Sequence, residues 1–329
     1  MLTALGCLAG SSTACTLHDD GAQGPQGTID SGDDGGAVAP GTDAAGTDGS
    51  GDDGASPPPH TSLRIAHASP DMPSIDVCVA AHGTTDFQGP LVGQLVDVIA
   101  GDAGEGAEGG AGGDAGLSGV AYAQVSAYLP VGPAQLDVRI VAAGASSCAV
   151  ALVPDLTDLP TLALDTYTTL LVAGELSPVG SDMGVVVTML SDDALLAGGA
   201  ASLRAINAMP SEPSLDFGMQ SSTNEWVPLF TDVPFAASSM KTNPDDGVAD
   251  RNGYVPIAPF SGQGVSARPS SSDAATNAAA GNVTIDFGAI ATVVAIGGKT
   301  GDSAHPPALL LCTDNQPSGG VFADCSIVQ

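Results

Sequence analysis

The feature that most constrains this chain is an internal repeat. The segment LRIAHASPDMPSIDVCV (63–79) returns 140 residues later as LRAINAMPSEPSLDFGM (203–219), and Leu, Arg, Ala, two prolines, Ser and Asp coincide. YLPVGP (128–133) returns as YVPIAP (254–259) at an offset of 126, and TLLVAG (169–174) returns as TVVAIG (292–297) at an offset of 123. Self-similarity of this kind indicates one structural unit used more than once. We therefore expect two copies of one domain, at 62–190 and 201–329, joined by SDDALLAGGA (191–200).

The falling offset requires extra residues in the first copy. GDAGEGAEGGAGGDAGLSG (101–119) supplies them, and its Gly-rich acidic composition predicts a surface loop. Residues 19–61 contain no aromatic and almost no large aliphatic side chain. Such a segment cannot bury enough apolar surface to offset its ordering entropy, so we expect a disordered acidic Gly/Asp-rich linker there.

Within each copy, short runs of β-branched and alternating residues are separated by Pro, Gly and Asp, which favours strands over helices. Strands are predicted at 63–68, 75–80, 93–99, 120–128, 136–142, 167–173 and 185–190, and at 202–208, 214–219, 225–233, 283–290, 292–296 and 308–312. About seven short strands per copy are typical of a sandwich. The predicted fold class is all-β, with two tandem antiparallel β-sandwich domains after the linker.

The charge of the chain excludes some partners. It carries 37 acidic residues against 7 basic ones, a formal net charge of −30, and no Lys or Arg precedes Arg64. Binding to nucleic acid or to anionic lipid through a basic patch depends on Lys and Arg, so neither is expected.

The N-terminus predicts export. MLTALGCLAGSSTAC is apolar and ends in small residues, like an export signal, although it has no positive n-region. Cys15 follows Ser-Thr-Ala, close to the site at which bacterial lipoproteins are cut and diacylated. We hypothesise that 1–18 is an export signal and that Cys15 carries a lipid anchor. A plain secretory signal or an ordinary tail is the alternative.

If Cys7 leaves with the signal and Cys15 is lipidated, four cysteines remain, and four permit three pairings. The two-copy layout favours Cys78–Cys148 and Cys312–Cys325, because each pair then closes a loop within one copy. Such disulfides are typical of an oxidising compartment.

The centre of the repeated motif, HASPD, has two interpretations. His67, Ser69 and Asp71 are the residue types of a hydrolase triad, which gives a low-ranking enzymatic alternative based on His67 and Ser69. Residues two apart in a strand line up on one face instead of converging. The second copy has Asn207 and Met209 in place of His67 and Ser69, so a Pro-bracketed structural turn is favoured.

What both copies retain is an arginine and a later aspartate. We predict that Arg64 pairs with Asp76 or a nearby backbone carbonyl, and that Arg204 does the same with Asp216. Breaking such a pair, if it is buried, costs about 3–5 kcal/mol.

Two further sites are weighed. TNPDDGVADRNG (242–253) is acidic but does not fit the ligand spacing of a calcium loop, so calcium-dependent adhesion is a minor alternative and no metal or cofactor is expected. Trp226, in the predicted strand EWVPLF, is expected to pack into the hydrophobic core rather than to stack on a sugar.

The HASPDxPxxDV motif, the later Y-L-P and the second, divergent copy resemble a bacterial family of secreted domains of unknown function. The resemblance covers about 62–190 and 201–312 and implies an immunoglobulin-like β-sandwich behind a signal peptide or lipoprotein anchor, with no known activity or ligand. The Ala, Gly and Pro content and the acidic stalk also look like exported lipoproteins of myxobacteria. We therefore expect an exported, membrane-tethered, non-enzymatic module at the cell surface or outside the cell, with an unknown partner.

Overall fold

The computed structural model describes residues 61–94, 119–192, 200–221, 223, 225–239, 252–270, 277–298, 302–315 and 322–328. All of them lie in one compact unit, Ser56–Gln329. We call 61–192 the first half and 200–328 the second half. The expected export signal, nearly all of the linker and of the loop at 101–119, and Cys15 fall outside the described residues.

The described residues are almost entirely β, which confirms the predicted fold class. The first half contains one helical turn at 91–94 and the strands β1 (Thr61–Ala68), β2 (Ile75–Ala81), β3 (Gln124–Val125), β4 (Leu129–Val131), β5 (Leu136–Ala142), β6 (Tyr167–Ala173) and β7 (Val186–Asp192). The second half contains β8 (Ala201–Asn207), β9 (Ser214–Gln220), β10 (Trp226–Pro234), β11 (Ala237–Ser238), β12 (Val255–Ile257), β13 (Phe260–Pro269), β14 (Ala279–Ile285), β15 (Ile290–Ile296), β16 (Ala308–Thr313) and β17 (Cys325–Val328).

Each half forms two sheets around its own core. In the first half the sheet β3–β1–β6–β7, with β4 also paired to β1, faces the pair β2–β5. In the second half the sheet β11–β8–β15–β16–β17, with β12 paired to β8, faces the sheet β10–β9–β13–β14. The expectation of purely antiparallel pairing was wrong at one place in each half, because β1 pairs with β6 and β8 pairs with β15 in parallel.

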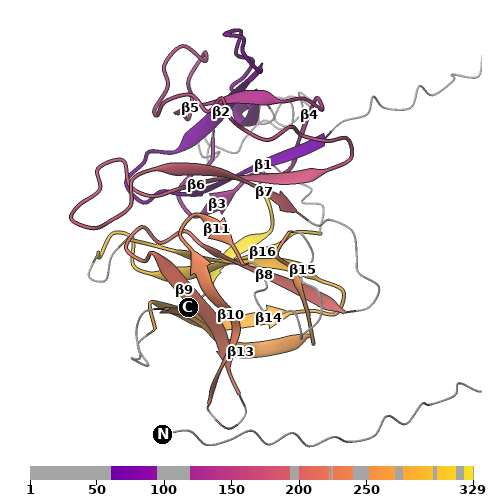
Figure 1. Ribbon diagram of the computed structural model, residues 1–329, viewed down its shortest axis with the longest axis vertical. Coiled ribbons are helices and arrows are strands. Elements are labelled where there is room, and N and C mark those ends of the chain that lie inside the picture. Colours follow the sequence, from indigo (N-terminus) through magenta and orange to yellow (C-terminus); the bar gives the residue numbers. More distant parts are fainter. Residues whose placement is uncertain are drawn as a thin grey trace, which may run out of the picture. The chain divides into compact units, whose positions relative to one another are not determined.

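The alternation of side chains along β1 and β8 produces a third core. Leu63 and Ile65 point into the core of the first half, and the same alternation in β8 turns Leu203 and Ala205 into the core of the second. The residues between them face the other way, and they meet in an apolar layer that joins the two halves. This layer contains Ala66, Ala68, Val125, Leu171, Ala173, Leu190, Ile206, Ala208, Ala236, Val294, Ile296, Ala308, Leu310 and Cys312. The sheets are therefore stacked in four layers, which can be followed from β2 and β5 to β13 in Figure 1.

Both predicted disulfides are confirmed. Cys78 is bonded to Cys148, and Cys312 to Cys325, and each bond lies within one half. Structural disulfides form and persist in oxidising environments, so this protein belongs in an extracellular or periplasmic setting. In the part of the chain that the structure describes, no helix has the length and apolarity needed to cross a membrane.

Candidate functional site

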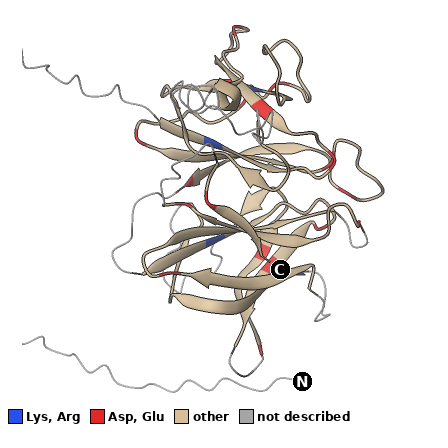
Figure 2. Ribbon diagram, turned by 180° about the vertical axis from the view of Figure 1, so that it is seen from behind, with Lys and Arg blue, Asp and Glu red and all other residues tan. Residues whose placement is uncertain are grey.

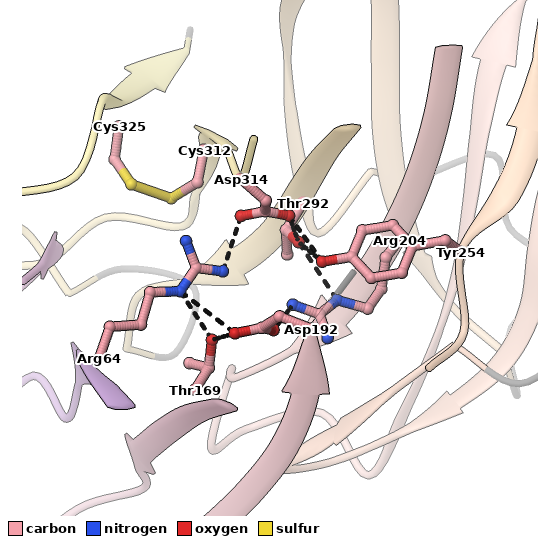
Figure 3. Close-up of a disulfide and its surroundings, with 9 residues drawn as sticks. All are labelled: Arg64, Thr169, Asp192, Arg204, Tyr254, Thr292, Cys312, Asp314 and Cys325. Atoms are coloured by element: carbon pink, nitrogen blue, oxygen red, sulfur yellow. Dashed lines mark hydrogen bonds and ion pairs between the residues drawn. A yellow bond between two sulfur atoms is a disulfide. The ribbon is translucent and has the colours of Figure 1, made fainter. Parts of the chain in front are cut away.

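The most unusual site of the molecule is a set of buried polar side chains where the two halves meet (Figure 3). Arg64 lies in β1 and Arg204 in β8, each between residues that point into the core of its own half. Only 2% of Arg64 and 0% of Arg204 is exposed. Because fully buried arginines require partners, their surroundings define the site.

Each arginine crosses from its own half to a carboxylate of the other. The Nη2 of Arg64 donates to Oδ1 of Asp314 at 2.7 Å, and the Nη2 of Arg204 donates to Oδ1 of Asp192 at 2.6 Å. Within its own half, the Nε of Arg64 donates to Thr169 at 2.8 Å and the Nε of Arg204 donates to Thr292 at 3.2 Å. The Nε of Arg64 also lies 3.5 Å from Oδ2 of Asp192 in its own half, so two of the three ion pairs of the cluster are exchanged between the halves.

A tyrosine and a threonine from each half complete the coordination of the carboxylates. Tyr128 and Thr169 donate to Oδ2 of Asp192 at 2.9 and 2.6 Å. Tyr254 and Thr292 donate to Oδ2 of Asp314 at 2.7 and 2.5 Å. The interface cluster thus consists of Arg64, Tyr128, Thr169 and Asp192 from the first half and Arg204, Tyr254, Thr292 and Asp314 from the second.

The tyrosine rings also lie against the guanidinium groups. The Cζ of Arg64 is 4.8 Å from the ring centroid of Tyr128, and that of Arg204 is 4.5 Å from the ring centroid of Tyr254. Attraction between a cation and a ring face strengthens as water is excluded, so these contacts add to the ion pairs.

Protonation equilibria in the cluster follow from its charge balance. Burial alone would raise the pKa of Asp192, but Arg64 and Arg204 outweigh it and hold that pKa below its ordinary value. Burial would lower the pKa of each arginine, and the opposing carboxylates raise it instead. Burial, helped by Asp192, raises the pKa of Tyr128, so its phenol stays protonated and can donate. The cluster is a neutral set of two cations and two anions with its donors directed at its acceptors.

The predicted pairing of Arg64 with Asp76, and of Arg204 with Asp216, was wrong. β1 and β2 lie in different sheets, and Arg64 faces the other half of the molecule, away from β2. Asp76 is buried and accepts the backbone N–H groups of Val77, Val92 and Gly93 at 2.7–2.9 Å. Burial raises the pKa of Asp76 despite these bonds.

Asp216 has a similar role in the second half. Its Oδ1 accepts the backbone N–H of Asp232 at 2.7 Å and the hydroxyl of Ser270 at 2.6 Å. Both aspartates of the repeated motif therefore accept hydrogen bonds from backbone N–H groups instead of pairing with an arginine.

The HASPD residues do not form a relay among themselves. The Nδ1 of His67 accepts the backbone N–H of Ser69 at 3.3 Å, and its Nε2 lies 3.0 Å from the carbonyl oxygen of Pro73. Asp71 is exposed and accepts the backbone N–H groups of Leu176 and Ser177. The side chains of His67 and Asp71 thus contact backbone groups in different places, and the buried hydroxyl of Ser69 has no hydrogen-bond partner among the described residues.

Asn207, at the position of His67, makes equivalent contacts. Its Oδ1 accepts the backbone N–H of Met209 at 3.1 Å and its Nδ2 donates to the carbonyl of Glu212 at 2.9 Å. An imidazole and an amide can both supply one acceptor and one donor, which explains why His67 and Asn207 make equivalent contacts in the two halves.

Two other predictions concern a metal site and Trp226. Among the described residues, no group of three or more His, Cys, Asp or Glu side chains is placed to hold a metal ion. Most of the acidic segment at 242–253 lies outside those residues. Trp226 does not lie in the core: it is half-buried on the outer face of its sheet, and its Nε1 donates to Ser266 at 3.0 Å.

Of the four residues that each half contributes, sequence reasoning singled out only the arginines, Arg64 and Arg204. Arg64, Tyr128 and Thr169 each belong to one of the repeated segments, as do their counterparts in the second half. The aspartates were missed. They follow LS in MLSD (189–192) and CT in LCTD (311–314), at an offset of 122, which continues the falling series of offsets and could have identified them.

Comparison with known proteins supports the expected kind of family, but it does not support the expected division of the chain into two domains that meet at 191–200. No curated protein matches this sequence. One family match begins at the first residue of β1 and runs past the expected join at 191–200 into β9, so it includes Arg64, Asp192 and Arg204. Residues 61–218 match the family model described as Domain of unknown function (DUF4397), so this part of the chain is similar to a domain of unknown function.

Proposed function

We propose that this protein is an exported, membrane-tethered, non-enzymatic module that binds a partner or provides structure at the cell surface. We also propose that it consists of two copies of one β-domain. The observation that carries the proposal is the interface cluster: the side chains repeated between the copies serve to join them, and they leave the outer faces of the molecule for recognition.

Three features support this proposal. The two disulfides match an oxidising location. Cys15 stands at the end of an apolar segment, and the acidic, Gly-rich residues after it would act as a spacer between a membrane and the folded unit. His67 and Ser69 are each at most 1% exposed, and the ring nitrogens of His67 bond to backbone groups and not to the hydroxyl of Ser69, which disfavours the hydrolase alternative.

The test is mass spectrometry of the mature protein isolated from the cells that produce it, with fractionation of membranes from soluble protein. We expect a diacylated Cys15 at the new N-terminus and recovery in the membrane fraction. An intact Met1 on a protein recovered from the cytosol would overturn the proposal. A mature, unlipidated chain in the medium would retain export and remove the anchor.

A further inference from the structure

The outer sheet of the second half carries a groove that is independent of the interface cluster. The sheet β10–β9–β13–β14 packs one face on the core, and no described strand covers its other face (Figure 1). On that outer face lies a groove of about 260 Å³, slightly smaller than a pocket for a drug-sized ligand. It is lined by Gln220, Gly264, Val265, Ser266, Asn277, Ala280, Gly281 and Asn282.

The strand register explains why the groove is open. Val265 and Ala267 point into the core, so Gly264 and Ser266 face outward, opposite Asn282 and Ala280 of β14. Small side chains therefore form the floor. A Cβ added at Gly264 would meet nothing within 4 Å, so no described residue fills the space above the strand.

The walls of the groove are neutral hydrogen-bonding groups. Gln220, Asn277 and Asn282 each have an exposed primary amide, which supplies both donors and an acceptor. Gln220 and Asn282 have no side-chain hydrogen bond to another described residue, whereas Asn277 accepts the Nε of Arg268 at 2.9 Å. None of the lining residues carries a charge.

Trp226 stands beside this groove. It pairs with Gln220 in the sheet and reaches over Gly218 to Ser266, and a Cβ on Gly218 would come within 2.6 Å of its ring carbons. The Cζ of Arg268 lies 4.3 Å from the ring centroid. The indole is thus held in place on the outer face, next to the amides.

These groups select the class of ligand. Figure 2 shows few Lys or Arg on the ribbon, and the net charge of −30 repels phosphate and acidic ligands. A vicinal diol needs a donor and an acceptor at each hydroxyl, which primary amides provide. The guanidinium of Arg268 lies over the ring of Trp226, so the ligand class rests on the neutral amides and the indole serves as a neighbouring reporter. We propose that the groove beside Trp226 binds one or two residues of a neutral oligosaccharide. This inference deepens the proposed function by naming a ligand for the surface module.

The experiment uses the disulfide-bonded protein. It is first tested on an array of neutral oligosaccharides of glucose, mannose, galactose and N-acetylglucosamine, and a hit is titrated by calorimetry and by fluorescence. Trp226 is the single tryptophan of the chain, so its emission reports on this site alone. We expect saturable binding with a change in tryptophan emission at the same dissociation constant.

Variants locate the binding. Gly264→Leu fills the groove, and Gly132→Leu is the matched control, because a Cβ at either glycine has free space. We expect G264L to abolish binding and G132L to retain it, with thermal unfolding unchanged in both. Q220A/N282A removes two amides and should weaken binding about tenfold.

The inference is overturned if no neutral oligosaccharide binds, if G264L binds as tightly as the unmodified protein, or if a peptide library alone yields ligands for the groove. A diacylated Cys15 without any oligosaccharide binding would remove the ligand class and leave the proposed export intact. Oligosaccharide binding by a protein found in the cytosol would keep the ligand class and overturn the proposed export.

Discussion

At the scale of single residues, the buried arginines matter most. Arg64 and Asp314 are 250 residues apart in sequence, yet their side chains meet at 2.7 Å with at most 3% exposure of either. A buried charge whose partner is removed cannot be compensated by water, so the cost of breaking such a pair is large. The stability of the whole unit therefore depends on a few side chains.

Replacing Arg64 by Met should lower the free energy of unfolding by about 3–5 kcal/mol, because Asp314 is left buried without its arginine. Arg139→Met is the control. Arg139 pairs with Asp155 at 2.6 Å, but both side chains are partly exposed, so the loss should stay below about 1 kcal/mol. Urea unfolding of the two variants measures both values, and equal losses would contradict the account.

His67 should make stability depend on pH. Burial lowers its pKa to about 4, whereas an unfolded histidine titrates near 6.5. Between these values the unfolded chain binds the proton and the folded protein does not. The contribution of neutral His67 to the free energy of unfolding is therefore fully present above pH 6.5, and about 3 kcal/mol of that free energy is lost as the pH falls to 4.

His67→Asn should remove this pH dependence and keep the fold, since Asn207 makes the same contacts in the second half. Urea unfolding at several pH values between 4 and 7 measures the effect. The variant should lose less stability than the unmodified protein on acidification. Parallel curves for the two proteins would show that His67 does not titrate in this way.

At the scale of elements, the repeat made most strands predictable. The runs at 136–142 and 167–173 were predicted with the observed bounds, because they are rich in β-branched and large aliphatic residues. β13 was missed, because FSGQGVSARP combines Gly, Ser and Pro, residues that are depleted in strands. The open groove is a consequence of the same small residues.

The site was predictable only in its parts. The repeated segments marked Arg64 and Arg204 as important, but their partners were predicted within the same half, whereas the structure pairs each arginine with an aspartate of the other half. The local sequence pattern cannot predict towards which sheet an arginine side chain points, because that direction depends on how two separate cores pack. Trp226 was misplaced for a related reason: in β10 it alternates onto the outer face, above a glycine that makes room for its ring.

The two disulfides should stabilise the protein to different extents. Cys78–Cys148 closes a loop of 70 residues and Cys312–Cys325 one of 13. Loop-closure entropy predicts losses of about 4 and about 3 kcal/mol when each pair is replaced by Ala. Urea unfolding of C78A/C148A and C312A/C325A, each with the other disulfide verified by mass spectrometry, measures the difference. A larger loss in C312A/C325A would indicate that β17 also positions Asp314, two residues beyond Cys312.

At the scale of the whole molecule, the two halves share one interface of apolar residues around a neutral charge cluster. The apolar layer supplies the buried apolar surface of the interface, and the exchanged ion pairs specify how the halves face each other. Four layers of sheet then form one stacked unit.

The most direct test of this account is a double-mutant cycle on Arg64 and Asp314. We compare the free energies of unfolding of R64M, D314L and R64M/D314L with that of the unmodified protein. R64M leaves the buried Asp314 without an ion pair, and D314L leaves Arg64 with only its longer contact to Asp192 at 3.5 Å. The double variant removes both groups, so it should be more stable than the sum of the single losses predicts by at least about 2 kcal/mol. Losses that add within about 0.5 kcal/mol would contradict the claim that the exchanged ion pairs join the two halves.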